Sequence, residues 1–124
     1  MMIYRGGCHC GAVRYEFQVQ EEPEMVECNC SICVKSGYLH LIVPKEDFRI
    51  LSGQEQLQTY RFNTGKAQHL FCKTCGIKSF YIPRSHPDGI SVNAHCLDDV
   101  DSIGFRYTQF DGQNWEAAAA VLKN

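Results

Sequence analysis

Cysteine spacing is the feature of this sequence that most constrains its fold. Seven of the eight cysteines stand in close groups, which are Cys8-x-Cys10, Cys28-x-Cys30-x-x-Cys33 and Cys72-x-x-Cys75. A hydrophobic core does not require such groups, whereas thiolates at these separations are typical zinc ligands. The grouping therefore favours zinc sites over the alternative, which is a framework of disulfides.

Counting ligands divides these cysteines between two kinds of site. Two pairs together offer the four thiolates of a closed structural site, and we call them the closed cluster: Cys8, Cys10, Cys72 and Cys75. The remaining three thiols would leave a fourth zinc position open, as catalytic sites do. We call them the triplet: Cys28, Cys30 and Cys33. Alternation along an extended segment, followed by a turn, brings the three sulfurs of the triplet together. We therefore predict two zinc ions per chain, one structural in the closed cluster and one catalytic in the triplet.

Cys96 stands apart from these groups and leaves an alternative open. As a fourth ligand it would close the triplet and make both zinc sites structural. Four thiolates around one Zn²⁺ carry a net charge near −2, which makes the metal a poor acceptor for an incoming thiol. We therefore expect Cys96 not to be a permanent ligand of the second zinc, and we allow it a place near that site.

Other polar residues are weaker candidates. His9 alternates with two ligands along an extended segment and is expected to be exposed. His69 and His95 fall in strand-like runs, where a hydrogen-bonded structural role is commoner than general-base catalysis. Four basic residues could meet the carboxylates of a peptide-like thiol, although a solvated position is commoner for each: Lys35, Lys73, Arg61 and Arg84.

Charge and hydropathy argue against several classes of partner. The isoelectric point near 6.2 gives no global basic field, so nucleic-acid binding is not expected. No apolar run approaches the ~20 residues of a membrane span, and residues 1–7 lack the apolar run of a signal peptide. We expect an intracellular protein, cytoplasmic or nuclear, in which thiols stay reduced.

The remaining pattern predicts one mainly β domain over residues 1–124. Residues 12–20 alternate, with four apolar side chains on one face: Val13, Tyr15, Phe17 and Val19. Further strands are expected at residues 25–28, 38–43, 48–51, 57–62, 67–71, 79–82 and 90–95. One short C-terminal helix is expected at residues 115–122, with Asn114 as its N-cap.

These motifs also resemble a known family. The cysteine groups in the runs 6–13, 28–33, 71–76 and 95–98 are similar to those of the glutathione-dependent formaldehyde-activating enzyme (GFA) family, over nearly the whole chain. Residues 62–69 and 79–85 look most similar to the branch called centromere protein V.

The resemblance implies a fold, two metals and a reaction. It implies the Mss4-like (β-tent) zinc-bound fold, with structural zinc in the closed cluster and catalytic zinc in the triplet. The implied activity is that of a zinc-dependent carbon–sulfur lyase-type enzyme acting on glutathione–aldehyde adducts such as S-(hydroxymethyl)glutathione, with a small thiol such as glutathione as partner. The alternative is a non-catalytic, zinc-stabilised protein-binding module of the centromere protein V type.

Overall fold

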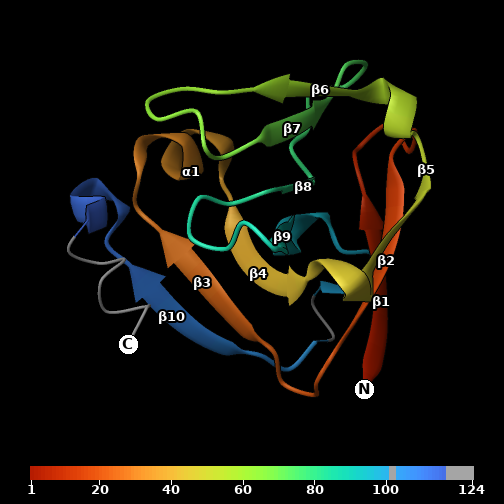
Figure 1. Ribbon diagram of the computed structural model, residues 1–124. Coiled ribbons are helices and arrows are strands. Elements are labelled where there is room, and N and C mark those ends of the chain that lie inside the picture. The colour runs from red at the N-terminus through yellow and green to blue at the C-terminus, as the bar shows by residue number, and fades with distance from the viewer. Residues whose placement is uncertain (101–102, 117–124) are drawn as a thin grey trace.

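The computed structural model describes residues 1–100 and 103–116 and consists mainly of β-strands (Figure 1). The strands are β1 (Met2–Gly7), β2 (Arg14–Val19), β3 (Glu24–Cys28), β4 (Leu39–Pro44), β5 (Phe48–Ser52), β6 (Leu57–Tyr60), β7 (His69–Cys72), β8 (Phe80–Tyr81), β9 (Gly89–Asn93) and β10 (Arg106–Phe110). The helical elements of the described residues are α1 (Ser31–Ser36) and the 3-10 turns η1 (Lys45–Asp47), η2 (Gln54–Gln56), η3 (Ala94–Cys96) and η5 (Gly112–Asn114). The prediction of a mainly β fold is confirmed.

The strands form three sheets that surround one core. Their orders are β1-β2-β5, β10-β3-β4-β9-β8 and β6-β7. In Figure 1 the three-stranded sheet stands at one side, the β6-β7 pair lies across the top, and α1 lies beside the upper end of β3. Neighbouring strands of the five-stranded sheet are antiparallel, apart from β10, which runs parallel to β3.

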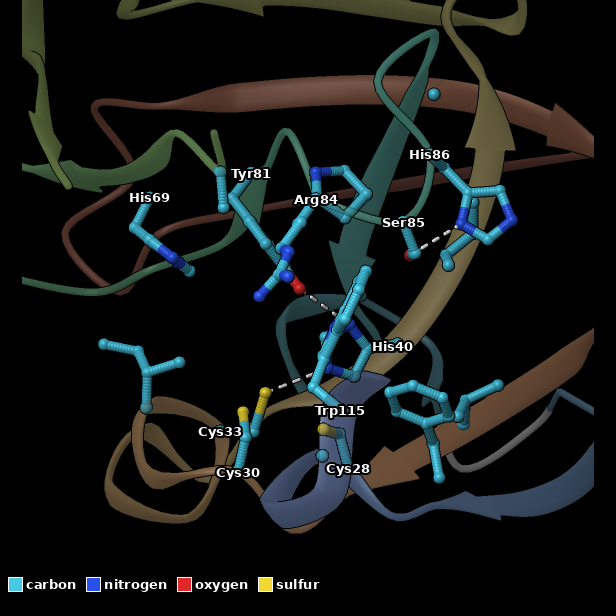
Figure 2. A pocket seen from close by; sticks show the side chains of 18 of the residues that line it. Cys28, Cys30, Cys33, His40, His69, Tyr81, Arg84, Ser85, His86 and Trp115 are labelled. Atoms are coloured by element: carbon cyan, nitrogen blue, oxygen red, sulfur yellow. Dashed lines mark hydrogen bonds between the residues drawn. The ribbon is translucent and has the colours of Figure 1, made fainter. Parts of the chain in front are cut away.

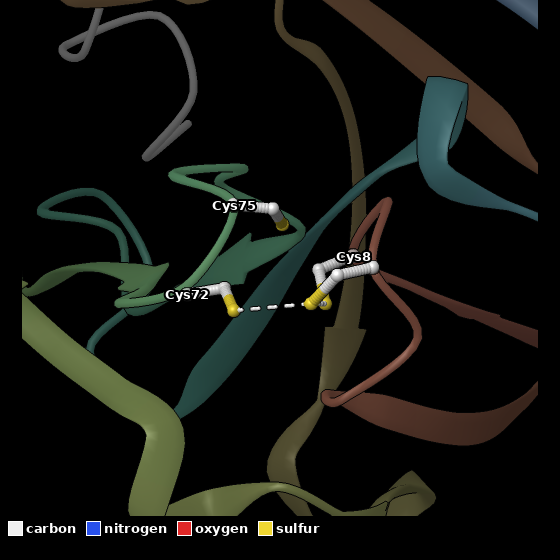
Figure 3. A group of neighbouring side chains, drawn as sticks. Cys8, Cys72 and Cys75 are labelled. Atoms are coloured by element: carbon white, nitrogen blue, oxygen red, sulfur yellow. Dashed lines mark hydrogen bonds between the residues drawn. The ribbon is translucent and has the colours of Figure 1, made fainter.

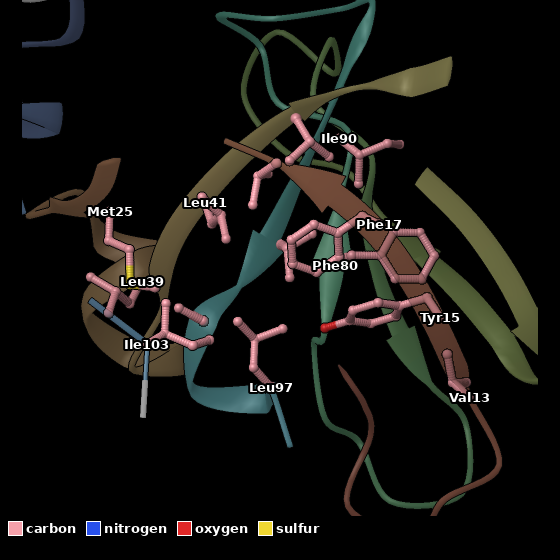
Figure 4. Close-up of a cluster of buried hydrophobic side chains, with 14 of the residues drawn as sticks. Val13, Tyr15, Phe17, Met25, Leu39, Leu41, Phe80, Ile90, Leu97 and Ile103 are labelled. Atoms are coloured by element: carbon pink, nitrogen blue, oxygen red, sulfur yellow. The ribbon is translucent and has the colours of Figure 1, made fainter. Parts of the chain in front are cut away.

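The core lies between β2 and the central strands of the five-stranded sheet (Figure 4). The alternation predicted for β2 is confirmed, because Tyr15 and Phe17 are buried while Gln18 between Phe17 and Val19 is exposed. The Tyr15 ring packs edge-on against Phe80 at a centroid distance of 5.6 Å, and its hydroxyl donates a hydrogen bond to the Ser79 carbonyl at 2.9 Å. The ring of Tyr15 thus joins the three-stranded sheet to β8.

Two strands were absent from the sequence prediction. Residues 2–5 of β1 are largely exposed and alternate poorly, and the first four residues of β10 are exposed, so neither strand shows the amphipathic pattern of a half-buried strand. Both are edge strands, which backbone pairing holds in place. Periodicity of side chains does not detect a strand of this kind.

Helical structure also differs from the prediction. The expected C-x-x-C turn of the triplet is the first turn of α1, which has Cys30 as N-cap and ends at Gly37 with φ at +61°. The predicted N-cap Asn114 lies inside the turn η5, and residues 117–122 of the predicted C-terminal helix lie outside the described residues. Among the described residues, no helix is long and apolar enough to cross a membrane.

Candidate metal centres and the cleft beside them

The closed cluster joins two segments that are far apart in sequence. Cys8 and Cys10 come from the β1–β2 connection, and Cys72 and Cys75 come from the end of β7 and the turn after it (Figure 3). The four sulfurs lie within 4.8 Å of one another. Cys10 Sγ is 3.6 Å from Cys8 Sγ and 3.7 Å from Cys72 Sγ. Tetrahedral zinc with Zn–S bonds of about 2.3 Å places its sulfurs ~3.8 Å apart, so the donor set fits a four-thiolate zinc.

Backbone amides support negative charge in the closed cluster. The Val13 N–H donates to Cys8 Sγ at 3.3 Å. Burial raises the pKa of Cys75, but backbone N–H donors at Cys10 and Ile77 oppose it, and the pKa falls to about 6. Gly76 has φ at +77°, a left-handed conformation that glycine adopts readily and that turns the chain after Cys75.

The triplet lies where β3 passes into α1. Cys28 ends β3, Cys30 caps α1, and Cys33 is the buried residue of that helix. The neighbouring thiols of Cys28 and Cys33 lower the pKa of Cys30. The bonds that Cys33 makes to Cys28 and Cys30 raise its own pKa.

His40 on β4 forms a candidate metal group with Cys28 and Cys33, a group that does not include the predicted ligand Cys30, and the sequence prediction missed His40. Its Nε2 lies 3.1 Å from Cys33 Sγ (Figure 2). Its Nδ1 lies 2.8 Å from Ser91 Oγ on β9. The ligand atoms of Cys28, Cys33 and His40 lie within 4.8 Å of one another, so together they could hold a metal ion. Burial lowers the pKa of His40 to about 4, which leaves the imidazole neutral and able to ligate. Only pairing of β3 with β4 and of β4 with β9 brings His40 to this place.

A buried cation lies near the triplet. Lys78 is 9% exposed, and its Nζ lies 3.9 Å from the centroid of the Tyr81 ring and 2.7 Å from His69 Nδ1, to which it donates a hydrogen bond. In the described part of the chain no ion pair joins Lys78 to a carboxylate. Burial lowers the pKa of Lys78 to about 8, while negative charge on Cys33 and its two partners raises it.

The triplet opens into a cleft of about 1140 Å³ (Figure 2). Its lining includes the three thiols, His40, His69 and Tyr81 at one end. The residues 83–89 and the turn η5 with Trp115 also line it. No residue of the closed cluster lines this cleft, so in the described residues it adjoins the triplet alone.

Several predicted positions need correction. Cys96 lies on η3 and belongs to neither group of candidate metal ligands; burial raises its pKa to about 11, with further contributions from Cys8 and Cys75. His95 lies on the same 3-10 turn and is exposed, not on a strand. His9 is exposed as predicted, and His69 is buried on β7.

The structure separates the four basic candidates. Arg84 lines the cleft, whereas the other three are exposed and do not line it: Lys35, Lys73 and Arg61. All eight cysteines are free thiols, which is the state that zinc binding requires.

Comparison with known proteins gives a consistent result. The family model "Glutathione-dependent formaldehyde-activating enzyme" matches residues 3–113. A Halomonas elongata protein provisionally named as a glutathione-dependent formaldehyde-activating enzyme is 27% identical over 105 residues, covering 78% of this chain and 67% of its own. A crystal structure of a Rhodobacter sphaeroides protein superposes with a TM-score of 0.74 at 34% identity, covering 84% of this chain and 98% of that one.

Proposed function

The chain belongs to the glutathione-dependent formaldehyde-activating enzyme family, and on this premise we propose that it is a zinc-dependent enzyme acting on glutathione–aldehyde adducts. In the proposed reaction the sulfur of glutathione bonds to the carbon of formaldehyde, and the thiol proton ends on the former carbonyl oxygen. The product is S-(hydroxymethyl)glutathione, and the reverse reaction breaks the same carbon–sulfur bond. The enzyme is thus of the carbon–sulfur lyase type.

The observation that carries this proposal is the opening of the triplet, and not of the closed cluster, into a large cleft. Four thiolates saturate a tetrahedral zinc, whereas three leave a position for a substrate thiol. We propose zinc in both clusters, structural in the closed cluster and catalytic in the triplet. When bound to the triplet, zinc supplies a position that holds a thiol as its thiolate.

The residues around the triplet favour a thiolate there. Lys78 places a buried positive charge near the three sulfurs without a carboxylate to neutralise it in the described residues. Three thiolates around Zn²⁺ carry a net charge of about −1, which one lysine offsets. The aromatic rings of Tyr38 and Tyr81 cover this lysine and keep water from it. The site is thereby arranged to hold one further anionic sulfur with less repulsion than bare thiolates would give.

Nuclear magnetic resonance exchange spectroscopy tests the proposed reaction. Zinc-loaded protein should accelerate the exchange of free formaldehyde with S-(hydroxymethyl)glutathione above the uncatalysed rate, and Cys30→Ser should remove the acceleration. An unchanged exchange rate, together with no measurable glutathione binding, would contradict the enzyme proposal.

A second function, a zinc-stabilised protein-binding module, has one observation in its favour. His40 Nε2 is near enough to Cys33 Sγ to serve as the fourth ligand of the triplet, and Ser91 Oγ would accept a hydrogen bond from the opposite ring nitrogen. Ligating histidines usually donate their second N–H in this way. A three-thiolate, one-histidine zinc would be closed, and the surface around it would then only bind a partner.

Nitrogen-15 spectra of the histidine side chains distinguish the two functions. In the closed arrangement the Nε2 signal of His40 moves on zinc loading and does not respond to glutathione. In the open arrangement glutathione binds to the metal, and His40→Gln keeps both zinc ions. A matched control is His86→Gln, since His86 is exposed and lines the cleft away from the sulfurs.

A further inference from the structure

We propose that Arg84 is the carboxylate-binding residue of the cleft, and that the chain's own Glu116 occupies this position until a carboxylate-bearing thiol displaces it. This inference rests on the proposed function, because it names the class of thiol that the cleft selects. It concerns a contact outside both metal clusters.

Arg84 is the cationic side chain that a substrate in this cleft would meet. Among the described residues that line the cleft, it is the only lysine or arginine. Its side chain is 22% exposed, so it is partly shielded from water but reachable. Guanidinium groups bind carboxylates through parallel charged hydrogen bonds, which fixes both position and orientation.

A carboxylate already lies on Arg84. Glu116 Oε1 is 2.6 Å from Arg84 Nη2, and the guanidinium carbon lies 3.5 Å from the centroid of the Trp115 ring. The Glu116 side chain is 85% exposed, and ion pairs of such exposed groups contribute roughly 0–1 kcal/mol. A ligand carboxylate can therefore replace Glu116 at little cost and keep the Trp115 ring beneath the guanidinium.

The segment that carries Glu116 is fixed to the triplet at its other end. A Cβ at Gly112 would lie 2.4 Å from Cys28 Sγ and 2.7 Å from Cys30 Cβ, so only glycine fits there. Asn29, between these two cysteines, accepts a hydrogen bond from the Gln113 N–H at 3.0 Å. Residues 112–116 thus run from the sulfurs to Arg84, and we call them the strap.

The length of the strap shows that one small thiol can reach both positions. Four residue steps separate Gly112 from Glu116, and an extended chain covers at most ~3.3–3.6 Å per residue. Arg84 therefore lies within a few residue lengths of the triplet, which matches the reach of a tripeptide such as glutathione. A sulfur at the triplet and a carboxylate at Arg84 can belong to one molecule.

Charge elsewhere in the cleft favours the same orientation. Three acidic residues also line the cleft, at the start of β3, in η1 and just before β9: Glu24, Glu46 and Asp88. They repel a substrate carboxylate, whereas Arg84 attracts it. The cleft therefore favours a thiol whose anionic group reaches Arg84 when its sulfur lies at the triplet.

Calorimetric titration of the zinc-loaded protein with two thiols tests this inference. Arg84→Met should weaken glutathione binding about tenfold, the usual loss for one charged hydrogen-bonded pair, and should leave the binding of 2-mercaptoethanol unchanged. Glu116→Gln should strengthen glutathione binding about two- to fivefold, because the competitor is removed. The matched controls are Arg49→Met and Glu16→Gln, which break an exposed ion pair on β2 and β5, away from the cleft. An equal loss for both thiols in Arg84→Met, or no loss beyond that of Arg49→Met, would overturn the inference.

A second measurement separates this inference from the proposed function. Trp115 is the single tryptophan of the chain, so its fluorescence reports on what lies against Arg84. S-methylglutathione, which has carboxylates but no free thiol, should change this fluorescence in the wild type and not in Arg84→Met. If no thiol binds but this response is present, the proposed function fails and the carboxylate position stands. If millimolar S-methylglutathione leaves the fluorescence of the wild type unchanged, the carboxylate position itself is wrong.

Discussion

The closed cluster and the triplet use the same ligand in two different surroundings. In the closed cluster, two cysteine pairs more than 60 residues apart meet within 4.8 Å, and backbone amides of Val13 and Ile77 are among the donors that reach its sulfurs. The triplet is local in sequence, and its surroundings are side chains: His40 beside Cys33, and Lys78 under Tyr81. Backbone donors are fixed by the fold, whereas substitution of a neighbouring side chain can change the charge of a metal site and its affinity for a ligand. On the proposed assignment, this difference suits the closed cluster to holding the fold and the triplet to holding a ligand.

Loss of one closed-cluster thiol should have the largest effect. Cys75→Ser breaks the junction between the β1–β2 connection and the end of β7. Metal binding there counts as folding free energy, on the order of 10–16 kcal/mol in zinc-finger peptides. We expect the variant to bind less zinc and to lose its cooperative thermal transition, as followed by circular dichroism and metal analysis. A Cys75→Ser variant as stable as the wild type would remove the distinction between the clusters.

Loss of one triplet thiol should be milder for folding and severe for binding. Cys30→Ser should keep a cooperative unfolding transition and one zinc ion per chain, because α1 and β3 are held by backbone pairing and by the core. Calorimetry should detect no glutathione binding. If Cys30→Ser unfolds as readily as Cys75→Ser, both clusters are structural and the enzyme proposal loses its support.

Removal of zinc with a chelator tests the difference between the closed cluster and the triplet without mutation. The zinc at the triplet should be the more labile, since it has fewer cysteine ligands and faces the cleft. A mild chelator should remove about one equivalent while the circular dichroism of the protein is retained, as the closed cluster still holds its metal. Simultaneous release of both equivalents with loss of the fold would contradict the assignment.

Lys78 tests the electrostatic part of the comparison. Lys78→Met removes a charge worth roughly 1–2 kcal/mol to a nearby thiolate at an effective dielectric constant of about 20. Glutathione affinity should therefore fall about tenfold, and Lys78→Arg should restore part of it. The closed cluster should keep its zinc, which metal analysis would show. Equal glutathione affinity in Lys78→Met and the wild type would mean that this lysine only fills space.

Cys96→Ala should have the smallest effect. The residue lies on η3 and is no member of either group of candidate ligands. We expect both zinc ions to be kept with similar affinity and glutathione binding to be unchanged. Loss of one equivalent of zinc would show that Cys96 takes part in a metal site after all.

Two features could be predicted from the sequence: the grouping of the four closed-cluster thiols and the position of β2. Cysteine spacing shows which thiols pair, because turns and alternating strands place neighbours i, i+2 and i+3 on one side whatever the rest of the fold does. Apolar alternation located β2, because its buried face follows a local period of two residues. Both kinds of information are local, so they are readable without coordinates.

The surroundings of the sulfurs depend on contacts between segments that are distant in the sequence. His40, Lys78, Arg84 and Gly112 lie on four different segments. The sequence offered Arg84 only as one of four basic candidates, and no local pattern marks the other three. The pairing of β3 with β4 places His40 beside Cys33. Lys78 lies in the connection between β7 and β8, and the strap follows β10, which pairs in parallel with β3. Cys96 is a further example, because its spacing in the sequence did not show whether it belongs to a metal site, and in the structure it is in neither group of candidate ligands. Proximity between distant segments depends on how the sheets assemble, and that is why the charge and selectivity of the cleft could not be derived from the spacing of its ligands.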